Sequence, residues 1–408
     1  MKIYKCRNCN KKKFINLFSL GKMSYTGKFP KNKNINIPKE EIKLIMCSNC
    51  KLVQISNNFS LSYMYNQDYG YRTGINQTMS NHVKNLVRKI NKITRIKKSD
   101  IVLDIASNDG TLLNYYSPKI TKIGVDPLIK KYRNNYKNVK YKYSTFFRKK
   151  LLSKKILNKK IKIITALSVF YDLKKPNIFL KEISNIINQN TGIFILEHAD
   201  LLSIIKNNLF DTICHEHLAY YSVHIINDMC KKNNLRIFDL EKNNINGGST
   251  RFYICHKFAQ YQKNDRNIKD FLKTETKSKI DKQITYVRFY KKINTIKKKL
   301  RNLLLKIKKQ GKEIHGYGAS TKGNLLLQYF ELRNDIISKI ADRNPNKAGS
   351  YSPGLKIPIV TEEASRAEKP EYYLVLPWHF KEEIIQRERN MIRNKTKFIF
   401  PLPNLKIY

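Results

Sequence analysis

The sequence predicts an α/β protein built from several domains. Short β-branched apolar runs alternate with stretches of helix length between about residues 100 and 200, and again after residue 310. Such alternation is typical of parallel sheets with helices on both faces. The 408 residues amount to about two to three usual domain lengths, and 41% of them are apolar, so we expect more than one hydrophobic core.

The order of these patterns predicts four consecutive parts. Residues 1–60 carry four cysteines and little apolar periodicity, which predicts a small lobe that depends on a metal. Residues 61–256 contain the first alternating region and should form the larger α/β domain. Residues 257–310 are lysine-rich with apolar residues at helical spacing, which indicates a linking helix or helix pair. Residues 311–408 should form a second, smaller Rossmann-like α/β domain.

The chain is strongly basic, with 80 lysine and arginine residues against 31 acidic ones and a formal net charge of +49. This charge alone indicates a nucleic acid or another anionic surface as partner. However, the lysines accompany asparagine and isoleucine along the whole chain, as in an AT-biased coding sequence, whereas binding surfaces concentrate their charge. We therefore favour a compositional origin and expect no specific nucleic acid partner.

Neither a membrane span nor a secretion signal is expected. We find no apolar run of about 18 residues, and no apolar core follows the basic N-terminus. Seven cysteines, four of them in two close pairs, fit a reducing compartment with a metal site better than a set of disulfides. The sequence therefore predicts a cytoplasmic protein.

Two short cysteine motifs predict a structural zinc site. Cys6 and Cys9 form the first pair, and Cys47 and Cys50 form the second. Four thiolates in two chelating turns are the ligand set of a closed tetrahedral zinc site. A catalytic zinc must keep an open coordination position, and no adjacent base is apparent, so we expect the zinc to support the lobe rather than react.

A loop of small residues after an apolar strand predicts a cofactor site. The strand runs into Asp104, and a second strand ends at Asp126, which is placed to bind ribose hydroxyls. These features resemble the first two motifs of class I methyltransferases, which bind S-adenosylmethionine. NAD is the alternative, but the loop lacks the glycines that a pyrophosphate requires. The predicted cofactor contacts in this region are Asp104, Ser107, Asp109, Gly110, Asp126 and Ala166.

Acid–base side chains are concentrated in residues 214–221, CHEHLAYY. His215 and His217 flank Glu216, so one imidazole can titrate near neutral pH while the carboxylate orients it. A polar cluster that merely closes the cofactor pocket is the alternative. A metal site here is not expected, because alternation along an extended segment would direct Glu216 away from both histidines.

Two glycine-containing segments predict contacts with an anion. In residues 316–324, GYGASTKGN, the N-terminus of a predicted helix and Lys322 could bind a phosphate group, although a tight turn would also need such glycines. Residues 246–252, NGGSTRF, place Arg251 beside paired glycines, where it could serve as a further phosphate partner.

Seven motifs occur in the order found in one enzyme family, and they cover the chain from Cys6 to about Pro403. The chain thereby resembles the sugar C-methyltransferases, which combine a zinc-binding N-terminal domain, a class I methyltransferase domain and a dedicated C-terminal domain. The motifs are CRNC with CSNC, QDYGYRTG, DIASNDGTLL, HEHLAYYS, NGGSTRFYICH, GYGASTKGN and LPWHFKEEI.

The resemblance implies a role for each matching residue. His217 would remove a proton from the carbon beside a ketone, supported by Glu216 and His215. Tyr69, in the cofactor site, and Tyr71, in the catalytic site, would form an aromatic lid. The substrate, a keto-sugar nucleotide, would contact Tyr221, Arg251, Gly318, Lys322 and Asn324. Many relatives have tyrosine where this chain has Cys214, and histidine at the end of the run where this chain has Asp172, which leaves the sugar and its acceptor carbon open.

Deprotonation next to a ketone makes a carbon nucleophilic, so a base, a hydrogen-bond donor and a methyl group held in line are sufficient for C-methylation. The sequence thus predicts a methyltransferase that uses S-adenosylmethionine and works as a monomer or homodimer. Transfer to oxygen or nitrogen is one alternative. A basic zinc protein that binds or modifies nucleic acid, and a scaffold that has lost activity, are the others.

Overall fold

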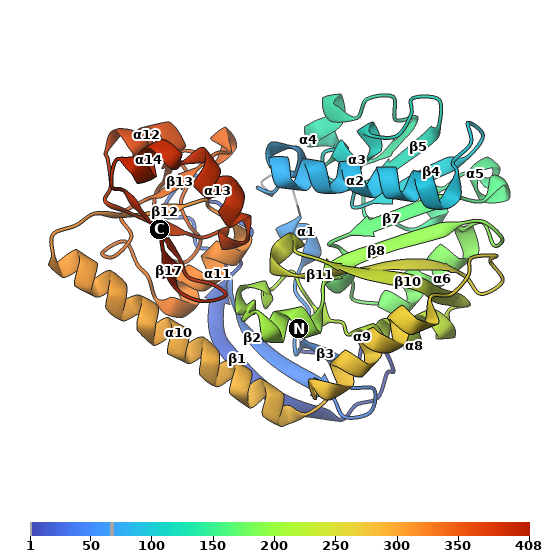
Figure 1. Cartoon of the computed structure of the whole chain (residues 1–408), viewed down its shortest axis with the longest axis horizontal. Coiled ribbons are helices and arrows are strands. Elements are labelled where there is room, and N and C mark those ends of the chain that lie inside the picture. The colour runs from blue at the N-terminus through green and yellow to red at the C-terminus, as the bar shows by residue number, and fades with distance from the viewer. Residues whose placement is uncertain (1, 66–68) are drawn as a thin grey trace.

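The computed structural model describes residues 2–65 and 69–408, so Gln67 and Asp68 of the predicted lid segment lie outside it. The described chain forms three sheets, of four, seven and six strands. Figure 1 shows the seven-stranded and six-stranded sheets in two separate α/β domains, with the strands of the N-terminal lobe running beneath both. The two predicted α/β domains and the cysteine-containing lobe are therefore confirmed.

The N-terminal lobe is an antiparallel sheet that recruits a strand from the central domain. Its own strands are β1 (Phe14–Ser24), β2 (Lys39–Cys47) and β3 (Val53–Ile55), and the short helix α1 (Leu61–Met64) follows. β3 pairs with β9 (Ala219–Tyr220), which comes directly after the predicted catalytic segment. The lobe therefore holds the chain on the C-terminal side of His217.

The central sheet has the order β10-β11-β8-β7-β4-β5-β6, in which β11 is antiparallel to both neighbours and the strands from β8 to β6 are parallel. The four apolar runs predicted from the sequence form the mostly buried strands β4 (Ile101–Ile105), β5 (Thr121–Val125), β7 (Ile163–Leu167) and β8 (Ile193–Ala199). The sheet also contains β6 (Tyr141–Tyr143), β10 (Leu235–Asn243) and β11 (Ser249–His256).

Helices cover this sheet, and α2 closes the edge where the cofactor is expected. Asn76 caps α2 by accepting a hydrogen bond from the backbone of Met79, and the apolar face of the helix is buried. The helices and 3₁₀ turns are α2 (Gln77–Thr94), α3 (Thr111–Asn114), α4 (Ile129–Tyr132), α5 (Lys154–Lys159), α6 (Pro176–Ile186), α7 (Leu201–Lys206), α8 (Val223–Lys232), η1 (Thr73–Ile75), η2 (Arg133–Asn135), η3 (Lys149–Leu151), η4 (Phe170–Asp172), η5 (Phe210–Thr212) and η6 (Ile245–Gly247).

Two helices connect the α/β domains. α9 (Asp265–Lys277) packs on the central domain, and the long α10 (Gln283–Lys309) passes β1 on its way to the C-terminal domain (Figure 1). The lysines of α10 lie mainly on its exposed face, whereas Phe289, Ile293, Leu300 and Leu304 are buried. The predicted helix pair is thus present, and its charge is solvated.

The C-terminal domain is a mainly parallel sheet of order β14-β13-β12-β15-β16-β17 with helices around it. No helix in the described parts of the chain is long and apolar enough to span a membrane. The elements are β12 (Ile314–Tyr317), β13 (Ile340–Asp342), β14 (Ile359–Thr361), β15 (Tyr372–Val375), β16 (Lys397–Phe400), β17 (Lys406–Ile407), α11 (Thr321–Phe330), α12 (Glu362–Ala367), α13 (Lys381–Arg387), α14 (Arg389–Arg393), η7 (Pro345–Lys347) and η8 (Trp378–Phe380).

Hydrogen bonds between side chains join the two α/β domains. The indole of Trp378 donates to Asp211 at 2.7 Å, and Thr78 at the start of α2 donates its hydroxyl to Glu383 of α13 at 2.6 Å. The carboxylate of Glu383 also accepts the backbone N–H of Thr78, next to the helix N-terminus that it complements electrostatically. These contacts fix the walls of the cleft between the domains.

Candidate active site and zinc centre

The four cysteines of the lobe converge on one point. The Sγ atoms of Cys6 and Cys50 are 3.6 Å apart, those of Cys9 and Cys47 are 3.5 Å apart, and all four lie within 4.8 Å of one another. Four sulfurs around a zinc ion at about 2.3 Å would be separated by somewhat less than about 4 Å, so this set fits a tetrahedral site. All four predicted ligands are therefore brought together as expected.

The two cysteine turns have the same local geometry. In each, a residue in the left-handed region ends the turn and donates its N–H to the first cysteine carbonyl, Asn10 to Cys6 and Lys51 to Cys47. Arg7, between the first two ligands, is buried and donates to the carbonyl of Ile55 at 2.9 Å. The zinc site is thereby tied to β3, the strand that pairs with β9.

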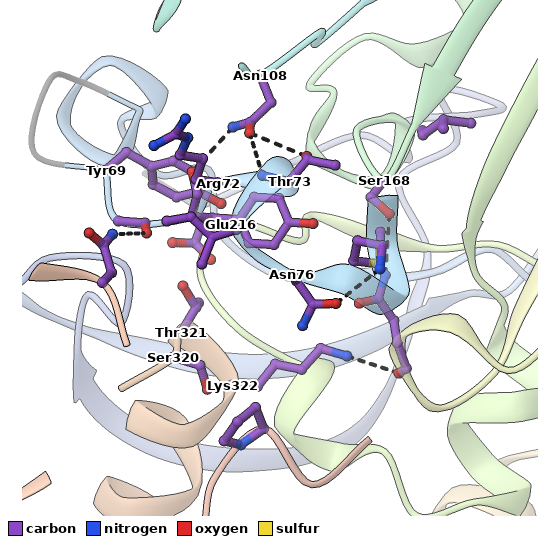
Figure 2. Close-up of a pocket in the computed structure, with 18 of the residues that line it drawn as sticks. Tyr69, Arg72, Thr73, Asn76, Asn108, Ser168, Glu216, Ser320, Thr321 and Lys322 are labelled. Carbon is purple, nitrogen blue, oxygen red and sulfur yellow. Dashed lines mark hydrogen bonds between the residues drawn. The ribbon is translucent and has the colours of Figure 1, made fainter. Parts of the chain in front are cut away.

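A cavity of about 410 Å³ lies between the central and C-terminal domains. Figure 2 shows Asn108 and Ser168 of the central domain and Ser320–Lys322 of the C-terminal domain around it. Both domains therefore contribute to one site, as predicted for a cofactor and a second substrate. The predicted site residues that line it are Tyr69, Tyr71, Asp104, Ser107, Asp126, Glu216, His217, Gly318 and Lys322.

The loop after β4 forms the cofactor side of this cavity. Asn108 has a positive φ, and its backbone N–H donates to Asp126 at 3.0 Å. Asp104 accepts a hydrogen bond from Thr165 at 2.6 Å. Burial raises the pKa of Asp104 to about 7 and that of Asp126 to about 6, so a ligand that donates hydrogen bonds to these carboxylates would favour their ionised forms.

Three of the predicted cofactor residues do not line the cavity, and each has another structural role. Asp109 points back to the lid segment and accepts hydrogen bonds from Arg72 at 3.1 Å and from the backbone of Gly74 at 3.0 Å. Gly110, at φ +79°, has no room for a side chain beside Tyr136. Ala166 is fully buried within β7. These three residues support neighbouring segments of the cavity wall without lining the cavity themselves.

The segment Cys214–His217 adopts a turn rather than the extended form assumed from the sequence. The turn directs Glu216 and His217 into the cavity and His215 to the opposite side. The sequence prediction excluded a metal here because an extended segment would direct Glu216 away from both histidines. That premise was wrong, since the turn brings ligand atoms of Cys214, Glu216 and His217 within 4.8 Å of one another.

His217 is held in one tautomer. Its Nδ1 is 2.6 Å from the carbonyl oxygen of Thr212, which can only accept, so Nδ1 carries the proton and Nε2 keeps its lone pair. The ring packs against Tyr171, with centroids 4.0 Å apart. Burial, followed by the positive charge of Lys322, lowers the pKa of His217 to about 3, so the imidazole is neutral at physiological pH.

Glu216 is a buried carboxyl group with unused hydrogen-bonding capacity. Its Oε2 accepts the thiol of Cys214 at 3.6 Å, while Oε1 has no hydrogen-bond partner among the described residues. Burial raises the pKa of Glu216 to about 7. A side chain at Gly27 would collide with Oε1, so the lobe closes over this carboxyl only because residue 27 is glycine.

His215 packs the lobe onto the central domain. Its ring contacts the edges of Tyr25 and Phe59, with centroids 4.8 and 4.9 Å away, and Nε2 lies 3.3 Å from the carbonyl oxygen of Glu40. Burial lowers its pKa to about 4. The structure therefore places this predicted catalytic residue away from the cavity.

Three predicted substrate contacts also lie elsewhere. Tyr221 is fully buried under the lobe. Arg251 pairs with Glu197 at 2.6 Å, because β11 sets these residues opposite each other. Asn324 donates to the carbonyl of Thr26 at 2.7 Å and so fastens α11 to the lobe. No sequence motif distinguishes such anchoring roles from ligand contacts, because both require polar side chains.

Several cavity residues were not predicted as site residues. Tyr65 and Tyr171 border the same space as Asp172, which the sequence marked only as a departure from related enzymes. His379 of the motif LPWHFKEEI lies across the cleft in the C-terminal domain. The polar types of these side chains were visible in the sequence, but their convergence depends on tertiary structure.

Three sequence families match consecutive parts of the chain. Residues 6–65 match a family described as "Putative zinc binding domain", residues 78–240 a "Methyltransferase domain", and residues 244–403 a "C-methyltransferase C-terminal domain". The C-methyltransferase NovU of Streptomyces niveus is 25% identical over 417 residues, which cover 99% of this chain and 97% of that protein.

Two solved structures each resemble less than half of this chain. An S-adenosylmethionine-dependent methyltransferase from Clostridium acetobutylicum is 14% identical, with 43% of this chain and 92% of that chain covered and a TM-score of 0.36. PKMT2 from Rickettsia typhi in complex with AdoHcy is 14% identical, with coverages of 46% and 55% and a TM-score of 0.35.

Proposed function

We propose that this chain, an S-adenosylmethionine-dependent methyltransferase by the families that it matches from end to end, methylates a carbon atom of a keto-sugar nucleotide. The observation that carries the proposal is the state of His217. The carbonyl of Thr212 accepts its Nδ1–H, and its unprotonated Nε2 belongs to a ring that lines the cavity. An unprotonated nitrogen beside a bound ketone is what the removal of a carbon-bound proton requires.

The C-methyltransferase family match over residues 244–403 and the NovU relative support carbon as the acceptor. His217 takes the proton from the carbon next to the ketone, and the resulting imidazolium is stabilised by the neighbouring carboxylate of Glu216. The adjacent carboxylate compensates for the low basicity that burial imposes on His217, because opposite charges favour each other in a site of low dielectric constant.

S-adenosylmethionine would supply an electrophilic methyl group on a sulfonium sulfur. Asp126 is placed at the end of β5 to accept hydrogen bonds from a ribose, and Asp104 closes the same end of the pocket. The backbone of Ala106–Asn108 bends through positive φ at both ends, which leaves room for a ligand above the strand ends. Tyr69 and Tyr71 line the cavity as well.

The nucleotide part of the substrate is assigned to the C-terminal domain. Gly318 has φ +81° and packs against Pro377, which brings the backbone turn to the cavity wall. Lys322 and Arg343 line the same wall and offer positive charge to a diphosphate. Lys322 already donates to the carbonyl of Asn246 at 3.0 Å, so a phosphate would be held next to the junction of the two domains.

Methyl transfer from labelled S-adenosylmethionine to TDP-, GDP- and CDP-linked 4-keto sugars tests this proposal. Label on a carbon of one of these sugars, lost in His217→Ala, is the expected result. Label on an oxygen or nitrogen atom would refute carbon methylation. If no sugar nucleotide of the panel is labelled while the cofactor binds, the substrate class is refuted.

A further inference from the structure

A second buried carboxyl group lies in the catalytic cavity. Asp172, at the end of η4, lines the cavity and is 5% exposed. The hydroxyl of Tyr65 donates to its Oδ2 at 2.7 Å, whereas Oδ1 has no partner among the described residues. The backbone beside Asp172 is held in place, because the carbonyl of Tyr171 accepts the backbone N–H of Leu218 at 2.7 Å.

The surroundings of Asp172 favour a neutral acid. In the described parts of the chain, no lysine, arginine or histidine forms an ion pair with it. Its neighbour Glu216 is also a carboxyl group with an unpartnered oxygen. Burial, despite the hydrogen bond from Tyr65, raises the pKa of Asp172 well above its ordinary value, and Glu216 raises it further. A buried carboxyl without a cation retains its proton rather than its charge.

We propose that Asp172 is a neutral carboxylic acid whose Oδ1–H donates a hydrogen bond to the ketone oxygen of the substrate. Oδ2 is occupied by the Tyr65 hydroxyl, so Oδ1 is the oxygen left to carry the proton. The inference rests on the proposed function, because it assigns the group that receives the developing charge. The two carboxyl groups of the cavity then have different roles. Asp172 donates a hydrogen bond to the ketone oxygen, and ionised Glu216 stabilises the protonated form of His217.

The electron balance is simple. His217 Nε2 takes the proton from the acceptor carbon, the C–H electron pair forms the carbon–carbon double bond of the enolate, and the carbonyl π pair moves to oxygen. The Asp172 O–H bond is not broken, since it only donates to that oxygen. A fixed donor in a water-poor site stabilises an oxyanion more than it stabilises the ground-state ketone.

The substitutions Asp172→Asn and Asp172→Ala separate hydrogen bonding from charge. Asparagine can still accept from Tyr65 and donate an N–H into the cavity, whereas alanine can do neither. With the keto-sugar nucleotide that the parent methylates, we expect solvent deuterium to enter the acceptor position about 100-fold more slowly in Asp172→Ala. Asp172→Asn should remain within about 10-fold of the parent. Asp228→Ala, on the exposed face of α8, is the control and should exchange like the parent.

A second measurement needs no substrate. The infrared difference spectrum of parent minus Asp172→Asn at neutral pH should contain the C=O stretch of a protonated carboxylic acid. An ionised carboxylate band in its place would overturn the proposal. So would exchange in Asp172→Ala at the parent rate, or equally slow exchange in folded Asp172→Asn and Asp172→Ala. Failure of the proposed function would show separately, as label on oxygen or as no label at all with the parent.

Discussion

The imidazole of His217 donates its Nδ1 proton to the carbonyl oxygen of Thr212 over 2.6 Å. Thr212 ends η5, whose Asp211 binds Trp378 of the C-terminal domain. The contact that fixes the tautomer of His217 is therefore one residue away from a contact that joins the two domains, so the packing of the domains and the orientation of the base are physically connected.

His217→Ala should lower kcat by about 10²–10⁴-fold, because the only group proposed to take the carbon-bound proton is removed. Affinity for S-adenosylmethionine, measured by calorimetry, should stay within about threefold of the parent. His224→Ala is the matched control, since His224 is exposed on α8. Full activity of His217→Ala would assign the base to another residue.

The pH profile of kcat should rise through pH about 7. Burial raises the pKa of Glu216 to about 7, and the carboxylate stabilises the imidazolium of His217 only when ionised, above that pH. The profile should be measured at saturating cofactor, so that titration of Asp104 and Asp126 in the empty pocket does not contribute. Glu216→Gln should lower the plateau and remove this limb; an unchanged limb in Glu216→Gln would contradict the assignment.

His215 should make folding stability depend on pH. Burial lowers its pKa from 6.5 to about 4 in the folded chain. Between these values the unfolded state binds more protons, so stability is complete above pH 6.5 and is lost as the pH falls toward 4, by up to about 3 kcal/mol. Denaturant unfolding of the parent should show a steeper decline over this window than His215→Gln. Equal slopes would argue against a neutral, buried His215.

The sequence predicted the elements that form the site better than it predicted which side chains line the cavity. The apolar runs that became β4, β5, β7 and β8, and the four zinc ligands, follow from local patterns that need no tertiary information. His215 and Arg251 were assigned to catalysis or to the substrate because they lie within the motifs HEHLAYYS and NGGSTRFYICH. The structure shows that they hold packed elements together, which depends on the turn at residues 214–217 and on the pairing of β11 with β8.

Removal of zinc should abolish methyl transfer although no cysteine of the zinc site lines the cavity. The lobe depends on the metal for its turns, and β3 of the lobe pairs with β9, just after His217. Cys9→Ser should therefore contain less zinc by elemental analysis, unfold at a lower temperature and lose activity. Cys230→Ala, on α8, should retain one zinc ion per chain. A metal-free chain with full activity would show that the lobe is dispensable.

Arg251→Met should reduce stability rather than substrate affinity. The guanidinium pairs with Glu197 and Glu241. Without the guanidinium, the buried carboxylate of Glu197 would lose its positively charged partner. The free energy of unfolding, measured with denaturant, should therefore fall by about 3–5 kcal/mol.

Lys322→Met is the comparison, because Lys322 lines the cavity and Arg251 does not. For the folded fraction of Arg251→Met, the KM for the sugar nucleotide should match that of the parent, whereas Lys322→Met should raise it about 10-fold or more through loss of a charged phosphate contact. A raised KM with unchanged stability in Arg251→Met would contradict this expectation and support the phosphate contact that the sequence predicted for Arg251. The cavity would then have to extend to β11 when the substrate binds.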